Sequence, residues 1–407
     1  MKSLLVLLLV AVPASAQDFT YRGFGQVQST LYPQTSPQDD DHVAVEVLFR
    51  IEPAYRATDW LTFAGSIDAR IDTVDRVERV WRLNVRDRTR LRPPLSLRDA
   101  RATFRKGPVT ADLGKQFVRW GKADILNPTD RFAPRDFLEV TDDEFLAVIG
   151  ARAQYERGPH SVDVVWAPTF TPSRTPLIGR RWAPVQRQTF ATTAFRDLDP
   201  VFPARSQYGA RWNVLGPGFE FSLSYFDGFN HLPQFTAFPL SSQPVVASQR
   251  TYAPLRMAGA DAAVPLRWFT VKGEIASLFT TSRVADDVVV YVVQLERQSG
   301  ELSLVAGYAG EIVTERRSSF DFAPDRGLTR AFLGRAGYTI DASSDISFEA
   351  AVRQNFDGVW IKGQYSEAIG AHWRATFAGT AIGGRERDFI GQYRRNSHVV
   401  LTARYSF

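Results

Sequence analysis

Charged side chains of both signs are concentrated in residues 119–137. They are Arg119, Lys122, Asp124, Asp130, Arg131, Arg135 and Asp136. Gly121, Pro128 and Pro134 favour turns between them. Opposite charges that face each other across a water-filled space narrow it and orient dipolar solutes. The segment therefore has the composition of a pore constriction.

Three aromatic side chains of this segment are candidate apolar anchors: Trp120, Phe132 and Phe137. Anchored in this way, the segment would fold back along the inside of a pore and pair its charges with those of the wall. The alternative is an external cap whose salt bridges are satisfied within the loop.

Other candidate chemistry is sparse. The histidines, at positions 42, 160, 231, 372 and 398, form no obvious Ser/His or His/Glu motif. Acidic runs at 39–41 and 142–144 have oxygen ligands suited to calcium, although solvated loop charge is the simpler interpretation. The sequence therefore predicts no enzyme, no metal site and no cofactor.

The elements that must position the charged segment are strands. Between residues 43 and 56 apolar side chains alternate with polar ones, and the alternation restarts over 61–72 after a short turn. Alternate side chains of a strand point to opposite faces, so each strand has one apolar face. The same pattern predicts about 18 strands (16–18), at 19–30, 43–56, 61–72, 97–106, 108–118, 145–156, 161–167, 205–215, 219–226, 252–263, 268–279, 288–298, 302–313, 328–340, 346–354, 358–367, 371–381 and 398–407.

The connections between these strands alternate in length. Short turns are expected at 57–60, 106–108, 157–160, 215–218, 298–300 and 341–345. Long segments are expected at 31–42, 73–96, 119–144, 168–204 and 227–251. Short periplasmic turns and long external loops are typical of outer-membrane barrels. The predicted fold class is all-β, a transmembrane antiparallel β-barrel.

The polar faces of the strands carry many charges. Predicted lumen-wall residues include Glu46, Arg50, Glu52, Asp68, Arg70, Arg101, Asp112 and Arg374. Predicted lipid-facing residues include Val47, Phe49, Ile67, Phe221, Val293 and Leu401. A dry lumen could not hold so many charges, so water, a charged plug or ion pairs must fill it. Lys115 falls on the apolar face, which indicates a bulge, snorkelling to the boundary or an error of register.

The two ends of the chain indicate export and barrel closure. Residues 1–16 have a positive start, an apolar run and an Ala-x-Ala ending, which predicts a signal peptide and a single barrel domain over 17–407. The strand at 398–407 ends with Tyr405 and Phe407 on its apolar face, as expected of a last strand that pairs with the first and is recognised by the barrel-assembly machinery. No later stretch is apolar enough for a membrane helix.

Composition excludes some other classes. The chain has no cysteine, which excludes disulfide frameworks and thiol chemistry. Its formal net charge of +5 is small for 407 residues and gives no indication of nucleic-acid binding.

The charged segment also carries a motif. It reads Gly114-x-Gln116-x-x-x-Trp120-Gly121, then Asp124, Asn127-Pro128-x-Asp130 and Pro134-Arg135-Asp136. This pattern resembles uncharacterised porin-like outer-membrane proteins, which are distantly similar to alginate-export-type barrels. The resemblance implies a barrel with a transport role and supplies no substrate or binding residues.

The functional hypothesis is a porin-like channel in the bacterial outer membrane for small hydrophilic solutes, constricted by the 119–137 loop. Expected partners are those solutes, outer-membrane lipid, lipopolysaccharide and the assembly machinery, with no nucleic acid and a homo-oligomer possible. Two alternatives are a non-channel envelope or assembly barrel with a blocked lumen, and a lipid-modifying enzyme using His372 or His398 with a neighbouring serine.

Overall fold

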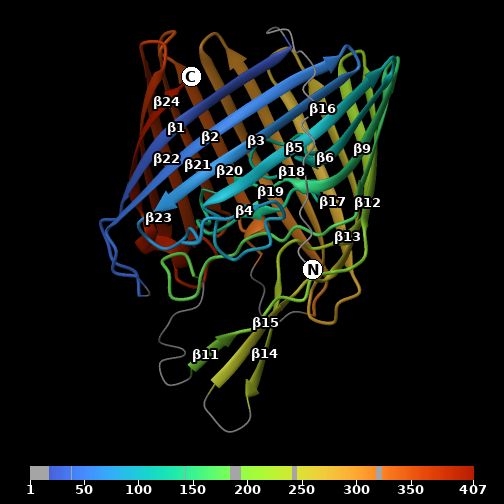
Figure 1. Cartoon of the computed structure of the whole chain (residues 1–407). Coiled ribbons are helices and arrows are strands. Elements are labelled where there is room, and N and C mark those ends of the chain that lie inside the picture. The colour runs from blue at the N-terminus through green and yellow to red at the C-terminus, as the bar shows by residue number, and fades with distance from the viewer. Residues whose placement is uncertain (1–17, 38, 143, 184–193, 241–244, 318–322) are drawn as a thin grey trace.

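The computed structural model describes residues 18–37, 39–142, 144–183, 194–240, 245–317 and 323–407. The predicted signal peptide, residues 1–16, lies outside them. Within the described residues, 18 antiparallel strands close into a barrel, which confirms the predicted fold class (Figure 1). They are β1 (Phe19–Leu31), β2 (Val43–Thr58), β3 (Leu61–Asp72), β5 (Leu95–Lys106), β6 (Val109–Gln116), β9 (Val148–Arg157), β10 (His160–Ala167), β12 (Gln207–Gly216), β13 (Phe219–Phe229), β16 (Pro254–Pro265), β17 (Thr270–Thr280), β18 (Asp287–Ser299), β19 (Leu302–Glu315), β20 (Ala331–Thr339), β21 (Ser344–Arg353), β22 (Gly358–Ile369), β23 (Trp373–Gly384) and β24 (His398–Ser406).

The barrel closes where the sequence predicts. Strand β24 pairs with β1 from Leu31–Val399 to Phe24–Ser406. Beyond the last of these pairs, Gly23 and Phe407 exchange two backbone hydrogen bonds of 3.0 Å each. Closure removes both free sheet edges, which a bilayer would otherwise leave without hydrogen-bond partners.

The connections lie as expected, with short turns at one end of the barrel and long loops at the other (Figure 1). Gly107 and Gly158 sit in two of the short turns with φ of 57°, a left-handed conformation that only glycine adopts without strain. At the long-loop end, β11 (Ala194–Asp197), β15 (Val245–Thr251) and β14 (Gln234–Leu240) form a small sheet that projects beyond the barrel. Among the described residues, no helix is long and apolar enough to cross a bilayer.

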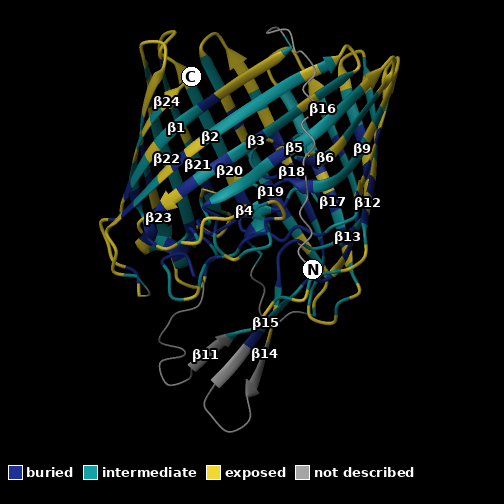
Figure 2. Ribbon diagram, viewed as in Figure 1, coloured by how far each residue is buried: buried dark blue, intermediate teal, exposed yellow. Residues whose placement is uncertain are grey.

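The alternation of faces follows the predicted register. Val293 and Leu401 are 52% and 48% exposed on the outside of the wall, and Val47 and Phe49 are also exposed. Ile67 and Phe221 pair with Ile51 and Val214, which lie on the same outward face. Most residues along the strands are of intermediate burial, with buried and exposed stretches among them (Figure 2).

Lys115 departs from this alternation, because it is buried although it follows Leu113 on the outward-facing positions. The preceding Gly114 has a φ of +128°, and a Cβ there would collide with the Ala100 carbonyl oxygen. Lys115 is buried, and its ammonium donates to Asp87 Oδ2 and the Leu97 carbonyl, both at 2.5 Å. The pairing of β6 with β5 and β9 runs through Lys115 without a register shift, so no bulge lies there, and the ammonium is satisfied in a buried ion pair instead of snorkelling to the boundary.

Candidate functional site

The segment between β6 and β9, residues 117–147, contacts wall side chains that point into the barrel; we call it the inner loop. Lys122 Nζ lies 2.6 Å from Glu220 Oε1 and 3.1 Å from Asp261 Oδ1, on β13 and β16. Asp124 Oδ2 lies 3.1 Å from Lys272 Nζ on β17. Two of the predicted constriction charges are therefore neutralised by the wall.

A single buried carboxylate on β17 holds the first half of the inner loop. Glu274 accepts hydrogen bonds from the backbone N–H groups of Lys122, Ala123 and Thr129, at 3.0, 3.1 and 2.8 Å. The Thr129 hydroxyl donates to the same group at 2.8 Å. A buried carboxylate is tolerated when its lone pairs are satisfied in this way. In the sequence, Glu274 is one polar residue of the alternating strand predicted at 268–279, and nothing beside it indicates a loop contact.

Asp130 stabilises a turn within the inner loop. Its Oδ1 accepts from the backbone N–H groups of Trp120 and Gly121, at 2.5 and 2.7 Å. Gly121 is required for space, because a Cβ there would lie 2.5 Å from Asn127 Cβ. Asp130 thus has a structural role in shaping the loop.

The three predicted anchors, Trp120, Phe132 and Phe137, are all buried. Trp120 Nε1 donates to Asp163 on β10 at 2.9 Å. The ring of Phe132 packs edge-on against those of Trp120 and Phe226, with centroids 5.5 and 4.9 Å apart. These contacts attach the loop to the wall by apolar burial and one polar bond.

Asp136 belongs to a network of charges at the long-loop end. It lies 3.0 Å from both Arg92 Nε and Arg174 Nη1. Burial alone would raise the pKa of the Asp136 carboxyl, but the two guanidinium groups hold that pKa well below its usual range. Arg92 also pairs with Glu46 at 2.9 Å, so loops 73–94 and 117–147 are joined to the wall.

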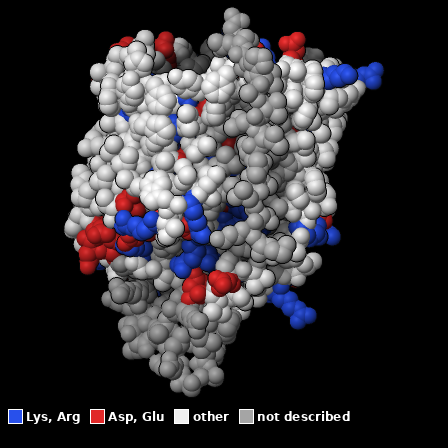
Figure 3. Space-filling view, in the orientation of Figure 1, with Lys and Arg blue, Asp and Glu red and all other residues white. Residues whose placement is uncertain are grey.

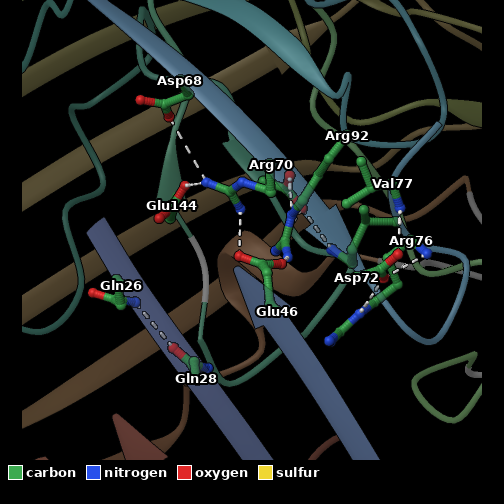
Figure 4. A network of polar contacts seen from close by, with 12 residues as sticks. Gln26, Gln28, Glu46, Asp68, Arg70, Asp72, Arg76, Val77, Arg92 and Glu144 are labelled. Carbon is green, nitrogen blue, oxygen red and sulfur yellow. Dashed lines mark hydrogen bonds and ion pairs between the residues drawn. The ribbon is translucent and has the colours of Figure 1, made fainter. Parts of the chain in front are cut away.

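The neighbouring part of this network centres on Arg70, on the inner face of β3 (Figure 4). It lies 3.1 Å from Glu46 and 3.2 Å from Glu144 of the inner loop. On the same face, Arg50 donates to both carboxylate oxygens of Asp68 at 2.6 and 2.8 Å. Four predicted lumen-wall residues are thus brought together here.

The remaining predicted constriction charges differ in their partners and in their exposure. Arg131 pairs with Asp325 at 3.3 Å. The guanidinium carbons of Arg119 and Arg135 both lie over the Phe145 ring, 4.2 and 4.3 Å from its centroid. Arg119 is exposed, and its Nε lies 3.5 Å from Asp130 Oδ2.

The other predicted wall residues pair along the wall. Arg101 lies 3.5 Å from Asp99, and Glu52 lies 2.5 Å from Arg22. Asp112 accepts a hydrogen bond from the Thr103 hydroxyl at 2.5 Å.

Opposite the inner loop lies an open cavity of about 420 Å³. Its wall residues come from β1 and from β21 to β24, and the inner loop contributes Thr141 and Asp142. The lining is mainly polar, with Gln26, Gln28, Asp345, Lys362, Gln364, Ser366, Arg374, Thr376, Thr380, His398, Thr402 and Arg404. We call this the open side, and the wall from β10 to β18 that contacts the inner loop the filled side.

Cations on the open side are incompletely neutralised. Arg404 donates to Gln26 Oε1 at 2.9 and 2.6 Å and lies over the Phe24 ring. Among the described residues, no carboxylate forms an ion pair with Arg404 or Lys362. Arg374 pairs with Asp345 at 3.3 Å, and both side chains are 46% exposed.

The histidines of the enzyme alternative do not meet a serine hydroxyl in the described part of the chain. His372 Nδ1 lies 2.8 Å from the Ser406 carbonyl oxygen, and His398 Nδ1 lies 2.7 Å from the Asn396 carbonyl oxygen.

Sequence reasoning missed the role of residues 138–145, because it ended the constriction at Phe137. The acidic run 142–144 had been interpreted as solvated charge or a calcium site, but Asp142 lines the cavity and Glu144 pairs with Arg70. It also missed His231, whose ring nitrogens lie 2.6 and 2.9 Å from the carbonyl oxygens of Thr171 and Arg131.

Comparison with known proteins relates the chain to solved barrels only. No family model matches the sequence, and no curated protein matches it. Acinetobacter baumannii OccAB4 superposes with a TM-score of 0.56 at 7% identity, over 96% of this chain and 98% of its own. Pseudomonas aeruginosa OpdQ gives 0.54 at 8% identity, over 96% and 98%. Pseudomonas aeruginosa OccK11 (OpdR) gives 0.53 at 10% identity, over 96% and 95%.

These neighbours are outer-membrane channels, and a structural likeness at such low identity shows a shared fold alone. The predicted resemblance to porin-like outer-membrane barrels is supported at the level of fold, whereas that to alginate-export-type barrels stays a prediction. A porin-like barrel of this kind is typical of bacterial outer membranes.

Proposed function

We propose that this protein is an outer-membrane channel through which small hydrophilic solutes pass. The observation that carries the proposal is the polar cavity of about 420 Å³ between the inner loop and the open side of a closed barrel. Charged and amide side chains on both its walls require water, and a water-filled gap beside a docked loop is the arrangement of a pore.

In this proposal the inner loop constricts the pore mainly by its volume. Lys122, Asp124, Asp130 and Asp136 are engaged by the wall or by the loop itself, so they add little free charge. The groups left to act on a passing solute are Arg119, Asp142 and the cations of the open side.

The lining favours hydrophilic solutes of small size. Glutamine, serine and threonine side chains can replace hydration waters without strong binding. Lys362 and Arg404 add positive charge opposite Asp142, so polar molecules would be oriented as they pass.

The same proposal places the mature chain in the outer membrane, with lipid and lipopolysaccharide around the wall. Pairing of Gly23 with Phe407 gives the C-terminal strand, including Tyr405, a direct role in closure, which is consistent with recognition by the assembly machinery. Association of several copies is compatible with the apolar outer wall.

Single-channel recording in planar bilayers tests the channel. We expect stable conductance steps, and liposomes holding the protein should admit small sugars. A barrel with a blocked lumen, favoured by the dense charge network around Asp136 and Arg92, would give neither. Lipid hydrolysis by the purified barrel would instead support the enzyme.

A further inference from the structure

Loop 73–94 carries an exposed apolar strip at the long-loop end of the barrel. The strip consists of Val80, Trp81, Leu83 and Val85. Within it, β4 (Leu83–Asn84) pairs in parallel with the start of β5, through Leu83–Leu95 and Asn84–Ser96. Strand β6 reaches only as far as Ala100 on that edge of β5, so β4 takes over the edge that β6 leaves when the chain turns into the barrel.

The pairing fixes the direction in which this strip faces. Leu83 is opposite Leu95, Leu95 is opposite Ala69, and Ala69 is opposite Phe49. Directly paired residues point to the same side of a sheet. Since Phe49 lies on the lipid-facing side, the row continues that surface through β3 and β5 onto the loop.

Large apolar side chains extend the row. Leu83 is 54% exposed and Trp81 is 62% exposed, and Val80 and Val85 are also exposed. The inner end of the strip is fixed by Asp87, which lies 2.5 Å from Lys115 and 2.9 Å from Arg174. Such a strip would be a costly surface in water, whereas tryptophan beside aliphatic side chains is stable at a membrane interface.

Three arginines are interleaved with the apolar residues: Arg79, Arg82 and Arg86. Arg79 pairs with the exposed Asp75, and Arg82 lies 3.6 Å from Glu78. Arg86 forms no ion pair among the described residues. The side chains of Arg79 and Arg82 are 71% and 64% exposed, and ion pairs of such exposed arginines contribute little free energy and can be exchanged for another anion.

We infer that this strip is a binding site for the phosphorylated headgroup of a membrane lipid, with lipid A phosphate as the ligand. The inference rests on the proposed outer-membrane placement, in which the long loops face outward and the outer leaflet carries lipopolysaccharide. Trp81, Leu83 and Val85 enter the upper acyl region, and the arginines bind phosphate as bidentate donors. In Figure 3, charged side chains gather below a broad uncharged band of the wall, at its long-loop edge.

The absence of cysteine allows a clean depth measurement. Single variants Leu83→Cys, Leu401→Cys and Val201→Cys carry a fluorophore in nanodiscs whose lipids bear a nitroxide near the headgroup. We expect quenching at positions 83 and 401, and none at the exposed loop position 201. Quenching at 401 without quenching at 83 overturns the inference alone, whereas no quenching at 401 overturns the membrane placement.

The identity of the headgroup is tested with acceptor-labelled bis-phosphorylated lipid A, diluted into phosphatidylcholine nanodiscs around the fluorophore at position 83. Arginines near an anionic surface attract it, so the triple variant Arg79→Ala/Arg82→Ala/Arg86→Ala should lower the lipid A enrichment measured by energy transfer at least about tenfold. The corresponding lysine triple should keep part of it. The matched control is Arg157→Ala/Arg267→Ala/Arg297→Ala, which removes three exposed arginines at the short-turn end and should change nothing.

Several outcomes would contradict the inference. Equal enrichment of dephosphorylated lipid A shows that phosphate is not recognised. Loss of enrichment in excess inorganic phosphate shows a site for the free anion. Energy transfer between two copies labelled at position 83, without lipid A enrichment, shows that the strip binds a second copy. The alanine triple should leave single-channel conductance unchanged, because these arginines do not line the cavity.

Discussion

The filled and open sides of the barrel are built from the same alternating strands, yet their inward charges meet different surroundings. On the filled side, the Asp261 side chain has no exposed area and lies between Lys122 and Arg211, at 3.1 and 3.0 Å. On the open side, Arg374 and Asp345 are each 46% exposed. One sequence pattern therefore produces a docking surface for a loop and, opposite it, a hydrated wall.

The difference matters because a charged group in a dry site is stable only while all its partners are present, whereas a hydrated charged group needs no partner. Substitutions on the filled side should therefore affect structure, and those on the open side should affect permeation.

Loss of Glu274 should have the largest effect. Glu274→Ala leaves three backbone donors and the Thr129 hydroxyl without their acceptor. Since each buried unsatisfied group costs about 1–3 kcal/mol, docking of the inner loop should weaken by about 3 kcal/mol or more. Rapid proteolytic cleavage within 117–147 and noisy conductance would show this.

Glu274→Gln is the matched control, because its amide oxygen still accepts hydrogen bonds. It should give an intermediate result. If Glu274→Ala resists protease as the unmodified protein does, Glu274 does not hold the loop.

The next largest effect is expected when an arginine is introduced on each of the two sides. Ser222→Arg places a charge at a fully buried filled-side position beside Arg211, whereas Thr376→Arg places it in the open cavity. The lipid-facing variant Val293→Arg is the reference, because an arginine near the bilayer midplane destabilises a barrel by about 2–4 kcal/mol. We expect Ser222→Arg to destabilise by a comparable amount and Thr376→Arg by far less, measured by urea unfolding in bilayers.

Equal unfolding free energies for the two lumen variants would show that both sides are equally hydrated, which contradicts the comparison.

Acid should loosen the filled side at His231, which joins the inner loop to two other loops. Burial lowers the pKa of His231 to about 4. A depressed histidine pKa contributes stability that is complete above the unfolded value of about 6.5 and is lost as pH falls towards 4. The shift corresponds to at most about 3 kcal/mol.

Protease sensitivity of the loops, followed from pH 7 to pH 4, measures this loss, and His231→Phe should abolish its histidine-dependent part. The same pH profile in both proteins would exclude His231 as the cause.

The smallest expected effect concerns ion selectivity. Replacing Arg119, Arg131 and Arg135 by alanine should shift selectivity towards cations, most clearly at low salt, where screening is weak. Arg131 is already paired with Asp325, so most of the change should come from the exposed Arg119. Reversal potentials in a salt gradient give the result.

Arg152→Ala is the control, because Arg152 pairs with Asp163 at 2.6 Å on the filled side. Unchanged selectivity in the triple variant would show that these arginines lie outside the solute path.

The sequence predicts the barrel far better than it predicts the site. Alternation places Phe49 outward and Asp68 inward because strand geometry is local and has a period of two. The same rule failed at Lys115, which follows a glycine of positive φ and is buried against Asp87 of a distant loop. Burial of Trp120 was predictable from its size and its neighbours.

The partners of the inner loop were not predictable, since they depend on contacts between residues distant in the chain. Nothing near Glu274 in the sequence indicates that it binds Thr129, which lies 145 positions away. Likewise, the role of Asp142 depends on which wall the end of the loop faces.

Modification of single cysteines during single-channel recording tests the location of the solute path most directly. Gln364→Cys lies on the open side and Ser222→Cys lies on the filled side, and the chain has no other cysteine. We predict that a negatively charged, water-soluble thiol reagent produces a stepwise fall in conductance at position 364 and no change at 222. Block at 222 without block at 364 would contradict a pore along the open side.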